Sequence, residues 1–173
     1  KRKTYAPGVK FSINESDAIT SVHQNLRDET FRFFKIEKEI EGIHNCVDVQ
    51  RFQKKPMYAF RRVIAPAGER ILLHASNFRK VKRVEDVLRI FDNVSKEIPS
   101  KLILVGDGPE RGNIEKLCRE LNTCDDIRSL GKIVNPERIL AIADLFILPS
   151  ETESFGLAAL EAMASKVPVI STN

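Results

Sequence analysis

The stretch ILLHASNFRKVKRVEDVLRIFDNVSKEIPSKLILVGDG, residues 71–108, decides the fold class of this chain. It opens with a short apolar run at residues 71–75 and closes with another at residues 101–105, each with the length and composition of a buried strand. Between them apolar residues recur at helical spacing: Val84, Val87, Leu88, Phe91 and Val94. A strand, a helix and a second strand in this order form a right-handed βαβ unit with parallel strands.

The same alternation continues beyond residue 108. Further helices are expected around residues 114–121, at 136–143 and after residue 156, and further strands at 127–130, 145–148 and 167–170. Short apolar strands that alternate with helices are typical of a parallel sheet covered on both faces. The expected fold class is therefore α/β, with a Rossmann-like parallel sheet and helices on both faces.

The residues before position 70 are organised differently. A strand is expected at residues 18–22, a helix at 25–34 and a strand at 39–44, followed by a polar, irregular stretch. One strand–helix–strand unit is too small for an independent core. We interpret residues 1–56 as the end of a preceding domain with its linker, and residues 57–173 as a truncated second domain, so that the chain is a fragment of a larger protein.

Composition limits the class of protein. Of the 173 residues 42% are hydrophobic, and the net charge of +4 suits an anionic ligand. The longest apolar run, residues 139–149, is interrupted by Asp144 and is too short to span a bilayer. The three cysteines lack C-x-x-C spacing, so we expect structural thiols in a reducing cytosol rather than a disulfide or metal ligands.

Two polar segments follow directly after expected strands. The basic cluster at residues 79–83 follows the strand at 71–75, and a loop with Glu153 follows the strand at 145–148. Parallel strands end at the same edge of the sheet, where ligands bind, so both segments are expected to face one ligand. The basic cluster alone is typical of a solvated surface or a nucleic-acid patch, but with two Tyr and no Trp in the chain we expect no nucleic-acid partner.

The segment from Glu151 to Ala164 has the pattern of a nucleotide-sugar site. Glu153 lies in a polar loop, Ser154 and Gly156 lie where a helix begins, and Glu161 follows two turns along. The start of a helix presents free N–H groups that favour phosphate. At about 1.5 Å per residue, Phe155 and Glu161 are about 9 Å apart along the helix axis, roughly the span of a pyrophosphate between two sugars.

Several segments, in order, resemble the retaining glycosyltransferases of family four, which have the GT-B fold. The run from Glu153 to Glu161, with seven residues between the two carboxylates, resembles their E-x(7)-E signature. The other matching segments are Asn45-Cys-Val-Asp48, Val105-Gly-Asp-Gly-Pro109, Ala143-Asp144, Leu148-Pro-Ser150 and Val167-Pro-Val-Ile170. The resemblance covers nearly the whole chain and implies a GT-B fragment that contains most of the C-terminal domain, and a glycosyltransferase as its parent.

The resemblance implies a catalytic set of Arg79, Lys82 and Glu153. Lys82 would bind the donor diphosphate, and Arg79 would supply the guanidinium that the family usually has near the position of Asn77. Glu153 would hold a hydroxyl of the donor sugar. We expect no metal site and no cofactor, because these cations and a helix N-terminus can meet the charge of the leaving diphosphate. Attack from the leaving-group side, with the phosphate accepting the proton, is the expected mechanism.

The implied donor-binding set is Ser76, Asn77, Gly106, Ile133, Ser154, Phe155, Gly156, Leu157 and Glu161. The backbone of residues 154–157 would hold the sugar and distal phosphate, and Glu161 would accept hydrogen bonds from the ribose. The backbone near Ile133 would meet the uracil, and Gly106 would allow the chain to approach the ligand closely.

Simpler interpretations stay open at several positions. Glu161 alone is typical of an exposed helix acid, and Gly106 and Gly108 also suit a tight turn without ligand contact. The spacing of Gly106, Gly108 and Gly112 misses the dinucleotide fingerprint by one residue, which makes that interpretation weak. His74 is expected to be a packed or hydrogen-bonded structural residue.

Within the family, residues 76–86 resemble the branch that transfers N-acetylglucosamine to L-malate in bacillithiol biosynthesis. This implies a bacterial, cytoplasmic enzyme with UDP-N-acetylglucosamine as donor and a small-molecule acceptor. Another donor or acceptor, such as a glycan or lipid, and a non-catalytic nucleotide-binding module are the alternatives. The fragment alone is expected to be inactive, because the acceptor domain is mostly absent; homo-oligomerisation and peripheral membrane contact stay open.

Overall fold

The computed structural model describes residues 2–53 and 56–172, which form two compact units. The first unit is Lys1–Cys46 and the second is Val47–Asn173. Phe52 is only 5% exposed and belongs to the core of the second unit. The domain boundary after residue 56 stays a prediction, while the compact units of this chain divide after Cys46.

The first unit contains the elements α1 (Arg2–Glu15), β1 (Thr20–Ser21), α2 (Gln24–Phe34) and β2 (Glu41–Gly42). The predicted strand, helix and strand are confirmed, although each strand has only two residues, and the two strands pair in parallel. The helix α1 was not predicted from the sequence. Pro7 and Gly8 lie inside it, and both residue types have low helix propensity.

The second unit contains a five-stranded parallel sheet in the order β5-β4-β3-β6-β7. Its strands are β3 (Arg70–Ala75), β4 (Ser100–Val105), β5 (Ile127–Gly131), β6 (Leu145–Leu148) and β7 (Val169–Ser171). Its helices are α3 (Tyr58–Ile64), η1 (Lys80–Lys82), α4 (Val84–Glu97), α5 (Arg111–Glu120), η2 (Cys124–Asp126), α6 (Pro136–Leu140) and α7 (Leu157–Ala164). The predicted α/β class is confirmed.

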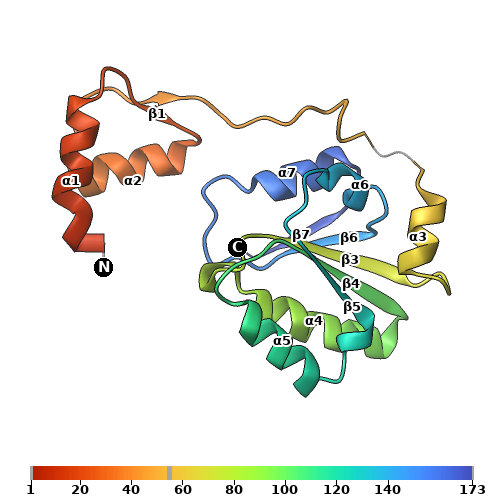
Figure 1. Ribbon diagram of the computed structural model, residues 1–173. Helices are drawn as coiled ribbons and strands as arrows, with labels where there is room; N and C mark the ends of the chain where they lie inside the picture. The colour runs from red at the N-terminus through yellow and green to blue at the C-terminus, as the bar shows by residue number, and fades with distance from the viewer. Residues whose placement is uncertain (1, 54–55, 173) are drawn as a thin grey trace. The chain divides into compact units, whose positions relative to one another are not determined.

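Helices cover both faces of this sheet, as Figure 1 shows, with α4 and α5 on one side and α6 and α7 on the other. The two faces follow from the alternation of side chains along each strand. Ile71 and Leu73 of β3 pack in the core formed with α6 and α7. Leu72, between them, packs in the second core, with α4 and α5. Continuous apolar strands therefore fill two cores at once.

The order of the strands reverses near the middle of the sheet, between β3 and β6. The chain passes from β3 outward through β4 and β5, then crosses back to β6 on the other side of β3. In open parallel sheets ligands bind at the carboxyl ends of the strands where the order reverses in this way. The loops after β3 and β6 carry Lys82 and Glu153, so two predicted catalytic residues lie at this switch point.

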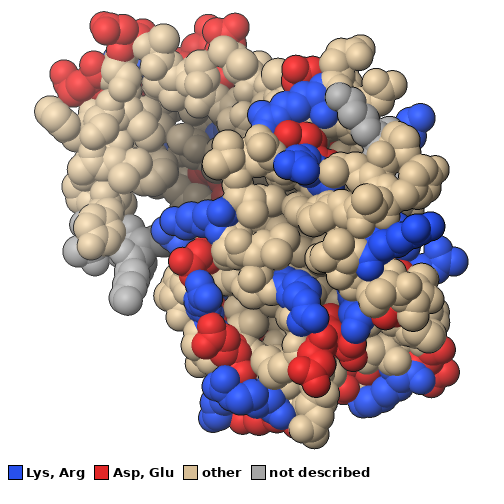
Figure 2. Space-filling view, turned by 45° about the vertical axis from the view of Figure 1, so that its right-hand side comes forward, with Lys and Arg blue, Asp and Glu red and all other residues tan. Residues whose placement is uncertain are grey.

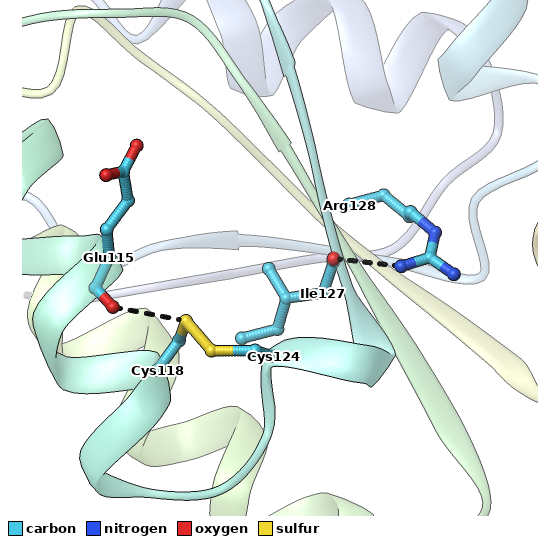
Figure 3. The surroundings of a disulfide bond; sticks show 5 residues. All are labelled: Glu115, Cys118, Cys124, Ile127 and Arg128. Atoms are coloured by element: carbon cyan, nitrogen blue, oxygen red, sulfur yellow. Dashed lines mark hydrogen bonds between the residues drawn. A yellow bond between two sulfur atoms is a disulfide. The ribbon is translucent and has the colours of Figure 1, made fainter.

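A disulfide joins Cys118 to Cys124, which corrects the prediction of free structural thiols. Figure 3 shows the bond between α5 and the start of η2. The chain reverses at Asn122, which has a positive φ of 55°, and this turn brings the two Cα atoms to 5.1 Å. Sequence spacing does not reveal such a reversal. Cys46 is a free, exposed thiol, and the cytoplasmic location stays a prediction.

Charged side chains of both signs are interspersed on the face of the molecule in Figure 2. Within the basic cluster Arg83 forms an ion pair of 2.5 Å with Asp86, and farther along the same helix Lys96 pairs with Asp92 at 2.7 Å. The cluster is therefore partly neutralised by neighbouring acids. In the part of the chain that the structure describes, no helix has the length and apolar character needed to cross a membrane.

Candidate nucleotide-sugar site

His74, a fully buried residue of β3, fixes the loop that follows this strand through a hydrogen bond to Ser76. Its Nδ1 lies 2.8 Å from the Ile147 carbonyl oxygen, and its Nε2 lies 2.8 Å from Ser76 Oγ. A carbonyl only accepts, so Nδ1 carries the proton and Nε2 accepts from the Ser76 hydroxyl. Ser76 Oγ in turn accepts from the Phe78 N–H at 3.3 Å. A neutral imidazole thus ties β6 to the loop that leads to Lys82.

Burial lowers the pKa of His74 from 6.5 to about 4. The hydrogen bond to the Ile147 carbonyl opposes this shift, the positive charge of Lys82 adds to it, and Glu153 opposes it more weakly. Protonation of Nε2 would require the Ser76 hydroxyl to turn from donor to acceptor, in a site where burial already disfavours the charged imidazolium.

We expect the free energy of unfolding to fall as the pH decreases from about 6.5 to about 4, by roughly 3 kcal/mol from His74 alone. The unfolded chain binds a proton at His74 in this window and the folded chain does not, so acid favours unfolding. His74→Asn keeps a donor for Ile147 but does not titrate. Urea unfolding of both proteins across this range measures the difference; parallel pH curves for the two would contradict the expectation.

Lys82 and Glu153 meet directly at the switch point. Lys82 Nζ donates to Glu153 Oε1 at 2.6 Å, and Ser150 Oγ donates to the same oxygen at 2.8 Å. The side chains of Lys82 and Glu153 are 20% and 26% exposed, so water only partly screens the pair. The structure thus brings together two residues that the resemblance assigned to adjoining parts of the donor, the diphosphate and the sugar. The role of Ser150 was missed from the sequence, although its position directly after β6 was a usable signal.

Arg79 lies directly before η1 and is exposed, as is Asn77 in the same loop. The tight turn of η1 is closed by a hydrogen bond of 2.8 Å from the Lys82 N–H to the Arg79 carbonyl. Arg79 and Lys82 therefore lie on one short turn that follows the carboxyl end of β3. Among the described residues, no group of three or more His, Cys, Asp or Glu side chains is arranged to hold a metal ion.

Gly106 and Gly108 are explained by close backbone packing after β4. Gly106 has a φ of 124°, and a Cβ there would lie 1.7 Å from the Ser76 carbonyl oxygen. A Cβ at Gly108 would lie 2.0 Å from the Asn77 carbonyl oxygen. The tight-turn interpretation accounts for both glycines. Ligand contact at Gly106 stays a prediction, although Gly106 does lie against Ser76, a member of the predicted donor-binding set.

The helix α7 begins at the predicted position, after Ser154 and Phe155. Gly156 precedes its first residue with a φ of 80°, and its carbonyl accepts from the Ala159 and Leu160 N–H groups. The first N–H groups of a helix have no intrahelical acceptor and favour an anion. The loop and helix start therefore have the form that the resemblance assigns to sugar and phosphate binding.

Glu161 and Ile133, predicted to contact the two ends of a nucleoside, line the same small cavity. The other lining residues are Leu73, Ala75, Val105, Pro136, Ile139, Leu140, Phe146 and Ala158. Burial raises the pKa of Glu161; Arg51 opposes this shift and Glu137 adds to it. Glu161 is thus partly buried in an apolar cavity, which contradicts its interpretation as an exposed helix acid.

Comparisons with known proteins agree with this geometry. The family model described as "Glycosyl transferases group 1" matches residues 59–173. The chain is 43% identical to N-acetyl-alpha-D-glucosaminyl L-malate synthase of Bacillus anthracis, over 95% of this chain and 43% of that protein. It is 36% identical to the alpha-monoglucosyldiacylglycerol synthase of Streptococcus pneumoniae, over 94% of this chain and 39% of that protein.

Solved structures with the GT-B fold are similar to the whole chain. The Anabaena HepE protein in complex with UDP-glucose matches with a TM-score of 0.87 at 18% identity, over 97% of this chain and 48% of that one. Sucrose-phosphate synthase from Thermosynechococcus elongatus matches with a TM-score of 0.79 at 26% identity, over 98% of this chain and 44% of that one. The chain spans less than half the length of each of these relatives. It has the fold of part of a GT-B glycosyltransferase, and it belongs to the group 1 glycosyltransferase family.

Proposed function

We propose that the full-length protein is a retaining glycosyltransferase that transfers N-acetylglucosamine from UDP-N-acetylglucosamine to L-malate. The observation that carries the proposal is the contact of Lys82 with Glu153, 2.6 Å long, at the switch point of the sheet. A cation for phosphate and a carboxylate for sugar hydroxyls are the groups that a nucleotide sugar needs there. The identity of donor and acceptor is supported by the similarity to the Bacillus anthracis malate synthase.

Donor binding exchanges the partners of this pair. The diphosphate takes the place of Glu153 on Lys82 Nζ, and the Glu153 carboxylate turns to hydroxyls of the sugar. Arg79, on the same turn, and the start of α7 add positive charge next to the diphosphate. These groups stabilise the charge that develops on the leaving UDP. The protein is therefore proposed to work without a metal or other cofactor.

In the proposed mechanism the acceptor hydroxyl attacks from the side of the leaving group and gives its proton to a phosphate oxygen. Glu153 binds hydroxyls and forms no covalent bond to the sugar. In its present contacts its Oε1 atom accepts two hydrogen bonds, which stabilise a carboxylate in a fixed position.

Glu153→Gln is therefore expected to lower kcat of the full-length protein by less than about tenfold, because the amide still bonds to sugar hydroxyls. Steady-state kinetics measures this, with Glu151→Gln in the exposed part of the same loop as the matched control. Mass spectrometry of the protein mixed with donor checks for an adduct. Complete loss of turnover together with a trapped glycosyl-protein adduct would overturn this mechanism and make Glu153 a nucleophile.

The similarity to the Streptococcus pneumoniae diacylglycerol enzyme favours a lipid acceptor as the second candidate, with the same donor half-site. A nucleotide-binding module without catalysis is the third. The chain spans less than half of its relatives, so the fragment is proposed to bind donor but to be inactive alone. Assays of the full-length protein with UDP-N-acetylglucosamine and L-malate, and with UDP-glucose and diacylglycerol, separate the first two candidates.

Calorimetry of UDP, GDP and UDP-N-acetylglucosamine, without divalent metal, tests the donor site first. We expect saturable UDP binding to the full-length protein, weakened about tenfold or more by Glu161→Ala, since the ribose hydroxyls lose a charged acceptor. Glu120→Ala, an exposed acid on α5, is the matched control. A folded full-length protein that binds none of the three nucleotides would overturn the proposal.

A further inference from the structure

The segment that precedes α3 has a defined conformation of its own. Asp48 Oδ1 accepts hydrogen bonds from the Gln50 and Arg51 N–H groups at 2.9 and 3.2 Å, and the Asp48 carbonyl accepts from Phe52 N–H at 3.1 Å. This turn is held on the second unit by the buried ring of Phe52. The position of Arg51 is therefore fixed by a local turn and by the buried Phe52 ring, and Arg51 belongs to the same compact unit as α6 and α7.

Arg51 joins this turn to the start of α6. Its Nε and NH2 groups donate to Glu137 Oε2 at 3.2 and 3.0 Å, and NH2 also donates to the Val134 carbonyl at 3.2 Å. Its guanidinium lies 5.5 Å from the centre of the Phe52 ring. The Arg51 side chain is 47% exposed, and a pair of this kind contributes only about 0–1 kcal/mol to stability. The small contribution of this pair to folding stability is thus a weak explanation for the three hydrogen bonds that Arg51 donates.

The residues that Arg51 bonds to flank the small cavity that Glu161 lines, without lining it themselves. Val134 and Glu137 are sequence neighbours of Ile133 and Pro136, which line that cavity together with Glu161. The charged groups that act on the Glu161 carboxyl are Arg51, from the segment before α3, and Glu137, from α6. Arg51 favours the carboxylate, while burial and Glu137 favour the neutral acid. Arg51 therefore fixes residues beside the cavity and also favours the charged form of the Glu161 carboxyl that lines it.

We propose that Arg51 is a positioning residue for the nucleoside end of the donor: it fixes Val134 and Glu137, next in sequence to the lining residues Ile133 and Pro136, and keeps Glu161 available to the ribose hydroxyls. The inference rests on the proposed function and adds a residue to its site. The ligand it serves is a nucleoside diphosphate, recognised through the ribose diol. Arg51 acts through Glu161 and the residues beside the cavity, whereas Lys82 acts on the diphosphate, so the two contributions can be measured separately.

The test is calorimetry of UDP and of inorganic pyrophosphate with the full-length protein. Arg51→Ala is expected to weaken UDP binding about tenfold and to leave pyrophosphate binding unchanged. Arg51→Lys, which keeps the charge, is expected to recover part of the loss, and Arg62→Ala, at an exposed position on α3, is the matched control. In wild type we expect acid to weaken UDP binding as Glu161 gains a proton. In Arg51→Ala we expect this loss at higher pH, since the favourable cation is gone.

Each outcome decides the inference. UDP binding by Arg51→Ala equal to wild type would overturn it and leave the proposed function intact. Equal losses for UDP and pyrophosphate, with a lower melting temperature, would assign Arg51 a purely structural role and also overturn it. A wild-type protein that binds no UDP would overturn the proposed function itself.

Discussion

Lys82→Ala is expected to lower kcat/KM of the full-length protein for its UDP-sugar donor by about 10²–10³-fold, because it removes a positioned cation from the leaving diphosphate. The effect has a second cause in this chain. Lys82 is the cationic partner of Glu153, whose side chain is 26% exposed, so its removal leaves an unpaired negative charge next to the proposed phosphate site. Steady-state kinetics at varied donor concentration measures the change.

Lys80→Ala is the matched control, since Lys80 is an exposed lysine on the same turn. It changes the net charge by the same amount, so its kcat/KM is expected to stay within about twofold of wild type when long-range attraction alone is altered. A Lys82→Ala protein as active as this control would show that the diphosphate binds elsewhere, and it would remove the main support for the donor site.

Gly106→Ala is expected to destabilise the protein by about 3 kcal/mol or more, or to prevent folding, because two penalties add. A φ of 124° is a conformation that residues with a Cβ rarely adopt, which costs about 1–3 kcal/mol. The new Cβ would also lie 1.7 Å from the Ser76 carbonyl oxygen, and overpacking of this kind costs about 1–3 kcal/mol. Urea unfolding measures the free energy directly.

Gly112→Ala provides the comparison at a glycine inside α5, where φ is ordinary and an added Cβ would have no neighbour within 4 Å. There the substitution is expected to stabilise the protein by about 0.5–1 kcal/mol, since alanine has the higher helix propensity. The two alanines should therefore have opposite effects. Equal unfolding free energies for the two variants would mean that the turn after β4 has another conformation in solution.

The strands and most helices could be predicted because their patterns are local. The apolar runs at residues 71–75 and 101–105 do not by themselves show how the two strands pair. The helix between them does, because a strand–helix–strand connection places the two strands in parallel. Where local preference and tertiary context disagree, prediction from the sequence was wrong or incomplete. Pro7 and Gly8 lie inside α1, and the reversal at Asn122 that joins Cys118 to Cys124 was not foreseen.

Part of the candidate site could also be predicted from local patterns. Lys82 and Glu153 each follow a strand, so the rule for carboxyl ends of parallel strands was enough to place them at one edge. The partners that surround them come from distant parts of the chain. His74 binds the carbonyl of Ile147, and Arg51 binds Glu137, contacts with sequence separations of 73 and 86 residues.

The sequence by itself determined the class of fold, the family and the edge of the sheet where Lys82 and Glu153 meet, because periodicity and motif spacing are properties of neighbouring residues. Only the tertiary structure decided that His74 is neutral, that Gly106 is required by the approach of Ser76, and that Arg51 bonds to Glu137 at the start of α6. These depend on burial and on distances of a few ångströms between segments far apart in the chain. Such distances exist only after the sheet and its helices have packed.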